Sequence, residues 1–527
     1  MKYSMILWVS LATAFAAAAD TRSLSARAAA LHSGETLMLE KGVYSLLEAE
    51  TTRMWLSPSN NDEGEKQVAI PLVGLHDITI DGGGSTLEAR GKVFPFALLG
   101  CTNVVLRNFT VQAHYPPWAA FTPIAKDDRG FTLRMDENCA PFTIPDGELE
   151  FDFDGSVVST REEKLSLHSL DRFAIHYYMS PITPADKSAL AASFLEVVAE
   201  ARNGREVRFG FRGGDHRSKI MTFPFNIGEH VVFNLAENRT RDVFFCEDCR
   251  NVSFENISFT RFGGMGIVAQ RCEDITLRNV VSLPAAGERI SLTADNVQLI
   301  NCGGNVLMEK CRMGWALDDP LNIHGNYLEV ESLEGRKLKL RSRHAQHAGF
   351  FPYRPGDRLE FFEMHSRRLL AAAKVVKWAP DAGDHARCTL EVDAEIPGVN
   401  HGAIVENVTL NPNVTIRDCE FTGFFHLRLS GRGDYLIENN RFTDGYASVL
   451  GMDLADYWYE SGRIGRMVIR NNTVTRRGWF NFGISGWNGN EPDLPKVHGS
   501  IHLEGNRFID FPGQKWSAIG VRDFSAK

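Results

Sequence analysis

Short strand-like segments that end at asparagine or a similar corner residue recur along the chain, and this repeat limits the fold more than any other feature. Apolar residues alternate within each segment with a period of two, and Val, Ile, Thr and Phe are frequent, which is typical of β-strands. The corner residues Asn256 and Asn279 are 23 positions apart. The clearest copies are CTNVVLRNFTV, CRNVSFENISF, CEDITLRNVVS, PNVTIRDCEF, GDYLIENNRF, GRMVIRNNTV and GSIHLEGNRF.

Strands that repeat at intervals of about 20–50 residues indicate a solenoid or a propeller. A propeller needs antiparallel blades joined by hairpin turns, whereas these strands meet at Asn, Asp and Gly corners, which favours coils stacked in parallel. The sequence therefore predicts an all-β protein, a right-handed parallel β-helix. Inward corner asparagines and cysteines are expected to form ladders along it.

Two stretches depart from the repeat and resemble small antiparallel β-barrels inserted into the coil. The first covers residues 114–238 and includes one amphipathic segment, residues 184–202, predicted as a helix; the second covers residues 327–406. The coil itself is then assigned to residues 20–113, 239–326, with the catalytic turns, and 407–527.

The N-terminus has the pattern of a secretory signal peptide over residues 1–19, with Lys2 before an apolar run and a small-residue cleavage site. We therefore expect export to the periplasm, the cell surface or the medium, and no second apolar run is long enough to span a membrane. The net charge of -9 argues against nucleic acid as a partner. Nine cysteines cannot all pair, and buried free thiols are the favoured interpretation.

Three acidic residues, Asp295, Asp318 and Asp319, lie inside runs that otherwise resemble core strands. Asp295 and Asp318 are 23 residues apart, the same offset as the two corner asparagines. This offset predicts that they stack on adjacent turns, about 4.8 Å apart. Asp319 precedes Pro320, which favours an extended or turn conformation and a corner position near the other two.

Closely spaced carboxylates raise one another's pKa, so that one of them stays protonated as a general acid. A pair of this kind suggests glycoside hydrolysis, in which the acid protonates the leaving oxygen and a second carboxylate activates water or attacks directly. The spacing along the sequence does not decide between the retaining and the inverting geometry.

The order T-A-D, D-D and H-G along a β-coil resembles the polygalacturonases, which are inverting β-helix hydrolases. Longer stretches are similar to glycoside hydrolase family 110, enzymes that remove α-1,3-linked galactose from the blood-group B antigen. These stretches are SNNDEGEKQVAIPLVGLHDITIDGGGS, RFGGMGIVAQRCEDITLRNV, GERISLTADNVQLINCGGNVLMEKC and LDDPLNIHG. They lie mainly in residues 35–110 and 240–330.

The resemblance implies an exo-acting, inverting α-1,3-galactosidase that needs no metal or other cofactor and acts on blood-group B-type or linear α-galactosyl glycans. From the polygalacturonase pattern, Asp318 would be the acid, and Asp295 and Asp319 would activate the water. No counterpart of the Arg-x-Lys that binds an acidic sugar is found, which argues against a uronic substrate. Substrate-binding roles are expected for Gln270, Arg289, Trp315, Asn322 and His324, with Trp458 and Trp487 as further stacking candidates.

Two other functions stay open at this point. A calcium-dependent polysaccharide lyase would use the three aspartates as metal ligands and would need a basic residue on a neighbouring turn. A glycan-binding adhesin would use the same coil without catalysis. The sequence leaves the oligomeric state open.

Overall fold

The computed structural model describes residues 23–128, 130–159, 165–169, 176–179, 197–211, 225–235, 239, 241–423, 426–445, 447–455, 458–476, 478–484, 495–511 and 513–527. The predicted signal peptide and Trp487 lie outside these residues and stay predictions.

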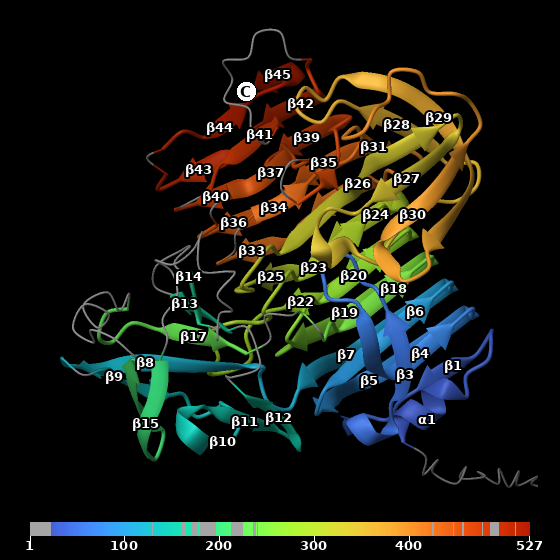
Figure 1. Cartoon of the computed structure of the whole chain (residues 1–527). Helices are drawn as coiled ribbons and strands as arrows, with labels where there is room; N and C mark the ends of the chain where they lie inside the picture. Colours follow the sequence, from blue (N-terminus) through green and yellow to red (C-terminus); the bar gives the residue numbers. More distant parts are fainter. Residues whose placement is uncertain are drawn as a thin grey trace, which may run out of the picture.

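The chain forms a parallel β-helix, because recurring strands pair in register with the strands one turn before and after them (Figure 1). The larger sheet consists of β1 (Thr36–Met38), β2 (Val43–Leu47), β5 (His76–Arg90), β7 (Thr102–Ala113), β19 (Arg250–Thr260), β21 (Glu273–Arg278), β22 (Val281–Ser282), β24 (Gly303–Glu309), β25 (Arg312–Gly314), β32 (Asn413–Arg417), β33 (Glu420–Thr422), β35 (Asp434–Glu438), β36 (Arg441–Thr443), β39 (Arg466–Arg470), β40 (Thr473–Thr475), β42 (His498–Glu504), β43 (Arg507–Ile509) and β45 (Val521–Ala526). The predicted fold class is thereby confirmed.

A second parallel face carries the functional residues. Its strands are β4 (Gly64–Val73), β6 (Val93–Leu99), β18 (Phe244–Glu247), β20 (Ile267–Gln270), β23 (Val297–Ile300), β26 (Leu321–Glu334), β34 (His426–Leu429), β37 (Ala447–Asp453), β41 (Phe480–Ile484) and β44 (Trp516–Ala518). Two short strands flank this face, β3 (Thr52–Leu56) and β38 (Glu460–Ser461), and both pair antiparallel with it.

Asparagine corners adopt the left-handed backbone conformation that the turns of the coil need. Asn108, Asn256 and Asn279 have φ values of 62°, 53° and 53°. Their side chains form a ladder, in which the amide of Asn279 donates to Asn256 and that of Asn256 donates to Asn108, at 2.9 and 3.0 Å. Asparagine tolerates this conformation better than most residues, so the repeat in the sequence reflects a local backbone requirement.

Inward-facing apolar side chains stack along the coil and form one continuous core. Phe244 shows the packing: it is fully buried, and its ring lies 4.8 Å from that of Phe96 and 5.2 Å from that of Phe254. All nine cysteines are buried and free. Helix α1 (Leu24–Ala29) adds Leu24 and Ala28 to the N-terminal end of this core.

The first insertion forms an open antiparallel sheet in the part that the structure describes, in the order β14-β13-β17-β8-β9-β16-β15, beside a three-stranded sheet β10-β11-β12. Its strands are β8 (Trp118–Lys126), β9 (Gly130–Met135), β10 (Phe142–Thr143), β11 (Glu150–Phe153), β12 (Ser156–Ser159), β13 (Leu165–Ser169), β14 (His176–Met179), β15 (Val197–Asn203), β16 (Glu206–Phe211) and β17 (Val231–Asn234). The end of the expected helix is therefore wrong, because Val197–Asn203 pairs with β16 as a strand; residues 184–196 lie outside the described residues.

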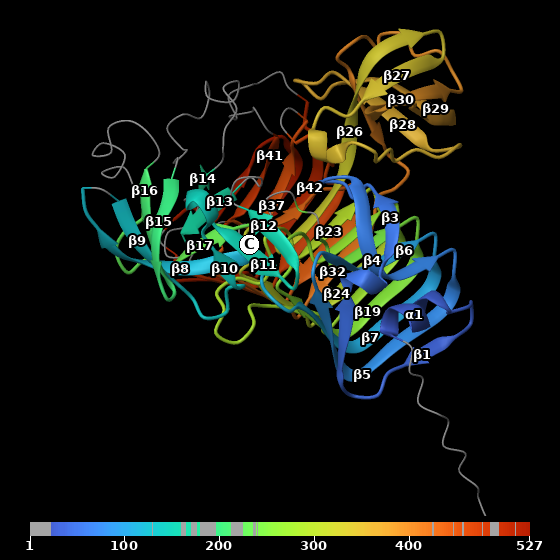
Figure 2. The same ribbon diagram turned by 60° about the horizontal axis from the view of Figure 1, so that its bottom comes forward.

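The second insertion closes into a six-stranded antiparallel barrel. Its order is β26-β27-β30-β29-β28-β31 and back to β26, with β27 (Lys337–Arg341), β28 (Arg358–Phe362), β29 (Leu369–Asp381), β30 (Asp384–Val392) and β31 (Ile404–Asn407). Strand β26 belongs to both parts, because Leu321–Ile323 pairs with the coil and Tyr327–Glu334 with the barrel. The two insertions project from different sides of the coil (Figure 2). Among the described residues, no helix has the length and apolar character needed to cross a membrane.

Candidate active site

The three aspartates lie together where two successive coil turns enter β23 and β26. The backbone amide of Asn296 donates to the carbonyl of Asp319 at 2.9 Å, which joins these turns just before the strands. Gln298 pairs with Asn322, an offset of 24 residues. Asp295 is therefore level with Asp319, and the expected register with Asp318 is wrong by one residue, because this turn is one residue longer than the turn between Asn256 and Asn279.

Asp295 and Asp319 are buried, at 3% and 4% exposure, and both carboxyl groups have a strongly raised pKa. Burial is the largest cause in each case, since it disfavours the charged form. The nearby carboxylate of Asp318 raises both further, and Asp295 also raises the pKa of Asp319. Asp295 and Asp319 thus retain a proton to higher pH than an isolated aspartate.

Asp318 is the most open of the three carboxylates, with a side chain that is 33% exposed. The guanidinium of Arg239 lies 2.5 Å from its Oδ2, and the backbone amide of Asp319 donates to its Oδ1 at 3.1 Å. Arg239 also donates to the carbonyl of Asn60 at 3.2 Å, which connects Asp318 to the loop between β3 and β4.

Asp319 is held from the next turn of the coil. The backbone amide of His426 donates to its Oδ1 at 3.2 Å, and Nε2 of the same histidine lies 3.6 Å away. These contacts fix the direction of the carboxylate, as a reacting group requires.

A buried ion pair between Arg428 and Glu460 lies beside the aspartates, with Nε and Oε2 2.6 Å apart. Burial opposes ionisation of Glu460, but the guanidinium of Arg428 outweighs it. The amide of Asn60, which donates at 2.9 Å, adds to this effect, and the pKa of Glu460 falls to about 2. The negative charge of Glu460 in turn contributes to the raised pKa of Asp295 and Asp319.

His324 is a neutral residue within this cluster, because burial lowers its pKa. Its Nδ1 lies 2.8 Å from the carbonyl of Gly325, which can only accept, so the proton resides on Nδ1. Its Nε2 then accepts from the amide nitrogen of Gln298 at 3.1 Å. Asn322 is the register partner of Gln298 on the neighbouring strand, on the outer face of the same sheet, and its Oδ1 is buried without a partner in the described structure.

The loop between β3 and β4 is fixed against the coil by Ser59. Its backbone amide donates to the side chain of Gln270 at 3.0 Å. Its hydroxyl lies 2.7 Å from Nδ1 of His347, a barrel residue, and accepts from Asn326 at 3.1 Å. The other end of Gln270 donates to the carbonyl of Ser57 at 3.2 Å. Gln270 thus positions the loop with both ends of its amide.

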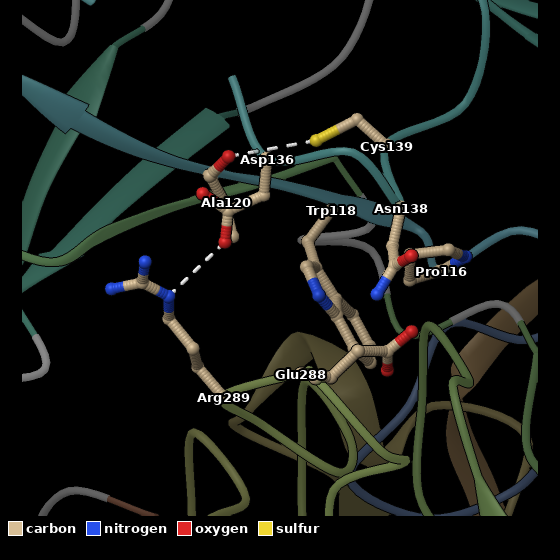
Figure 3. A pocket seen from close by; sticks show the side chains of 9 residues that line it. Pro116, Trp118, Ala120, Asp136, Asn138, Cys139, Glu288 and Arg289 are labelled. Carbon is tan, nitrogen blue, oxygen red and sulfur yellow. Dashed lines mark hydrogen bonds and ion pairs between the residues drawn. The ribbon is translucent and has the colours of Figure 1, made fainter. Parts of the chain in front are cut away.

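Arg289 lies in a different place from the aspartate cluster. It forms an ion pair with Asp136 of the first insertion at 3.1 Å, at the edge of a pocket that Trp118 and Glu288 also line (Figure 3). The space in this pocket is about 10 Å³, which suits roughly one water molecule and no sugar.

The aromatic candidates differ in exposure. Trp315 is 36% exposed, three residues before Asp318, and its ring packs directly on Gly423, where a side chain would collide with it. Trp458 is partly buried, and its ring lies 4.4 Å from that of His344 of the barrel. Its carbonyl accepts from His347 at 2.9 Å, so this residue also helps to fix the barrel beside the loop.

Four residues of the cluster were not expected from the sequence: Asn60, Arg239, Arg428 and Glu460. Of these four, only Asn60 is indicated by the sequence, because it belongs to the SNND segment that resembles glycoside hydrolase family 110. Within the described ranges, no group of three or more His, Cys, Asp or Glu side chains is arranged to hold a metal ion.

The curated proteins that resemble the chain in sequence and are named here are alpha-1,3-galactosidases. No protein-family model matches the chain. It is 27% identical to alpha-1,3-galactosidase B of Bacteroides thetaiotaomicron, over 84% of this chain and 70% of that protein. It is 28% identical to alpha-1,3-galactosidase A of Streptomyces avermitilis, over 93% and 81%, and 28% identical to alpha-1,3-galactosidase A of Akkermansia muciniphila, over 87% and 74%.

Solved structures resemble the chain only weakly. The family 28 exopolygalacturonase of Yersinia enterocolitica aligns with 92% of this chain and 78% of that one, at 8% identity and a TM-score of 0.30. The adhesin PfbA of Streptococcus pneumoniae aligns with 92% and 80%, at 8% identity and the same TM-score. These values are too low to carry an argument, and the identification rests on sequence: over most of its length, the chain is a homologue of proteins curated as alpha-1,3-galactosidases.

Proposed function

We propose that the protein is an exo-acting, inverting α-1,3-galactosidase that releases terminal galactose from blood-group B-type or linear α-galactosyl glycans. The observation that carries the proposal is the cluster of Asp295, Asp318 and Asp319, in which two buried carboxyl groups have a raised pKa beside a more open third one. The names of the homologous proteins support the substrate.

We assign the role of general acid to Asp295. Burial and the charges of Asp318 and Glu460 raise its pKa, and a general acid must hold its proton near neutral pH. This differs from the polygalacturonase pattern, in which Asp318 would be the acid. Asp318 is instead the more open carboxylate, held in place by Arg239 and by the backbone amide of Asp319, which suits a group that positions water.

Asp318 and Asp319 then bind and activate the water. Both carboxylates are held in a fixed direction, Asp318 by Arg239 and Asp319 by the backbone amide of His426. In an inverting reaction the base deprotonates a water that attacks the anomeric carbon while the acid protonates the leaving oxygen on the other side. The product is β-galactose.

Cleavage at the end of the glycan, rather than within it, is supported by the segments of the protein that meet beside the aspartates. Asn60, from the N-terminal part of the coil, donates to Glu460, 400 positions later, and Ser59 contacts His347 of the barrel. Enzymes that cleave within a polysaccharide need an open groove along the coil, and these contacts interrupt the coil face at this point.

The test is proton NMR of the first product from a B-type trisaccharide and from an α-1,3-galactobiose. β-Galactose should appear first and later mutarotate, and Asp295→Asn should slow its release sharply with the fold intact. α-Galactose as the first product would contradict inversion. Loss of activity with a chelator and an unsaturated product would indicate a lyase, and a wild-type protein that binds the glycan without cleaving it would indicate an adhesin.

A further inference from the structure

We propose that buried polar atoms around the Arg428–Glu460 ion pair bind hydroxyl groups of the terminal galactosyl residue, with Asn60 and Gln298 as fixed hydrogen-bond acceptors. This inference rests on the proposed function for the identity of the sugar. It assigns specificity to residues from three distant parts of the chain.

The orientation of the two amides follows from their partners. Asn60 directs its nitrogen to the ionised carboxylate of Glu460 at 2.9 Å, so its oxygen faces away from Glu460. Gln298 directs its nitrogen to Nε2 of His324, which has to accept because Nδ1 of the ring donates to Gly325. The oxygens Oδ1 of Asn60 and Oε1 of Gln298 are then left buried without a protein partner in the described structure.

Two further atoms in the same region lack a hydrogen-bond partner among the described residues: Oδ1 of Asn322 and one terminal nitrogen of Arg428. Gln298, Asn322 and Arg428 occupy matching register positions on three successive strands, so their side chains follow one another on the outer face of the sheet. Exposure of each is 7% or less. Buried polar atoms are almost always satisfied, so a row of unsatisfied ones points to a bound ligand or water.

The chemistry of this row fits a neutral polyol. Its unsatisfied atoms are the oxygens of Gln298 and Asn322, which need donors, and one guanidinium nitrogen, which needs an acceptor; Oδ1 of Asn60 adds a third oxygen beside the row. A sugar hydroxyl supplies both, whereas the charge of Arg428 is already balanced by Glu460 at 2.6 Å and offers no excess for a carboxylate. The charge of Glu460 acts on Asp295 and Asp319, which places the row beside the reacting groups.

Asn60 provides the cleanest variant, because its φ of 63° suits glycine as well as asparagine. Asn60→Gly removes the amide without straining the loop. Arg428→Lys and Gln298→Leu test the other atoms. Glu406→Gln is the matched control, since Glu406 is a similarly buried carboxylate that is ion-paired with Arg432 at 2.7 Å, at the barrel. All variants are compared with wild type and Asp295→Asn by thermal unfolding before use.

The readouts are the affinity for galactose, by calorimetry, and KM and kcat on the B-type trisaccharide. Asn60→Gly and Arg428→Lys should weaken galactose binding roughly ten- to a hundredfold, the usual effect of leaving a polar group unpaired in a complex. Glu406→Gln should leave binding unchanged, and Asp295→Asn should lose turnover but keep galactose affinity. Galacturonate should compete far less well than galactose.

Failure of the inference and failure of the proposed function give different results. Folded Asn60→Gly and Arg428→Lys proteins with wild-type galactose affinity and KM would overturn the inference, even if the enzyme releases galactose. A wild-type protein that binds galactose through these residues but cleaves no α-galactoside would overturn the proposed function and leave the binding site standing. No binding of galactose by wild type or Asp295→Asn would overturn the inference.

Discussion

Replacement of Glu460 by glutamine should destabilise the protein in a way that depends on pH. The pKa of Glu460 is lowered from 4.5 to about 2 in the folded chain. At about 1.4 kcal/mol for each pH unit of displacement, the ionised side chain contributes between about 3 and 4 kcal/mol to the free energy of unfolding. Glutamine removes this contribution and leaves the guanidinium of Arg428 buried without its counter-charge, so about 3 kcal/mol is a lower bound at pH 7.

The sign of the pH effect follows from the lowered pKa. The contribution is complete above the unfolded value of 4.5 and is lost as the pH falls toward 2, because over this range the unfolded chain takes up a proton that the folded chain does not. At pH 3.5 about 2 kcal/mol should remain, so the difference between wild type and Glu460→Gln should narrow by roughly 1 kcal/mol.

Urea unfolding at pH 7, 5 and 3.5 measures this difference. Glu438→Gln is the control: Glu438 is ion-paired with Arg470 at 2.7 Å, but the arginine side chain is 44% exposed, and such a pair contributes little. A Glu460→Gln protein that is as stable as wild type at pH 7, or a difference that stays constant from pH 7 to 3.5, would refute the reasoning.

Three further outcomes are expected. Asp295→Asn should lower kcat on a natural glycan by about 10²–10⁴. An aryl galactoside whose leaving group is a strongly acidic phenol should recover much of this loss, because such a leaving group needs little help from a general acid. Equal recovery by Asp318→Asn would contradict the assignment of Asp295 as the acid. Arg289→Gln should leave KM unchanged, because Arg289 pairs with Asp136 beside a space for one water; a clear rise in KM would place substrate there. Phe244→Ala should destabilise the coil by about 3–5 kcal/mol in urea unfolding, since the ring is fully buried among four other Phe rings, and a loss below 1 kcal/mol would contradict that packing.

The fold was predictable because its determinants are local. Each corner needs a residue that tolerates positive φ, and each strand needs alternating apolar residues. Every turn of the coil therefore repeats the same sequence pattern. Asn256 and Asn279 show both the spacing of this pattern and the side-chain ladder that it forms. The closure of an insertion depends on pairing between strands that are far apart. The sequence therefore suggested two barrels, whereas the described part of the first insertion is an open sheet and only the second closes.

The site was predictable only in part. Asp295, Asp318 and Asp319 are marked by their unusual position in apolar strands, and the structure brings them together. Their register was off by one residue because turns differ in length. Arg239 and Glu460 have no local signature; each reaches the cluster through the stacking of distant segments, as the separation of 400 positions between Asn60 and Glu460 illustrates.

Corner residues in the left-handed backbone conformation form a column along the coil. This column keeps successive turns aligned, whatever the number of residues between two corners. Lys310 and Asp418 are successive members of this column, with φ values of 55° and 57°. Beside them, the backbone amide of Cys311 donates a hydrogen bond to Sγ of Cys419, 108 positions later, at 3.3 Å. An entire barrel is thus accommodated between two turns without disturbing the stack. A longer or shorter excursion at such a point leaves the alignment of the coil intact, provided that its contacts with the coil, such as Arg354 with Asp248, and with the site loop, His347 with Ser59, are kept.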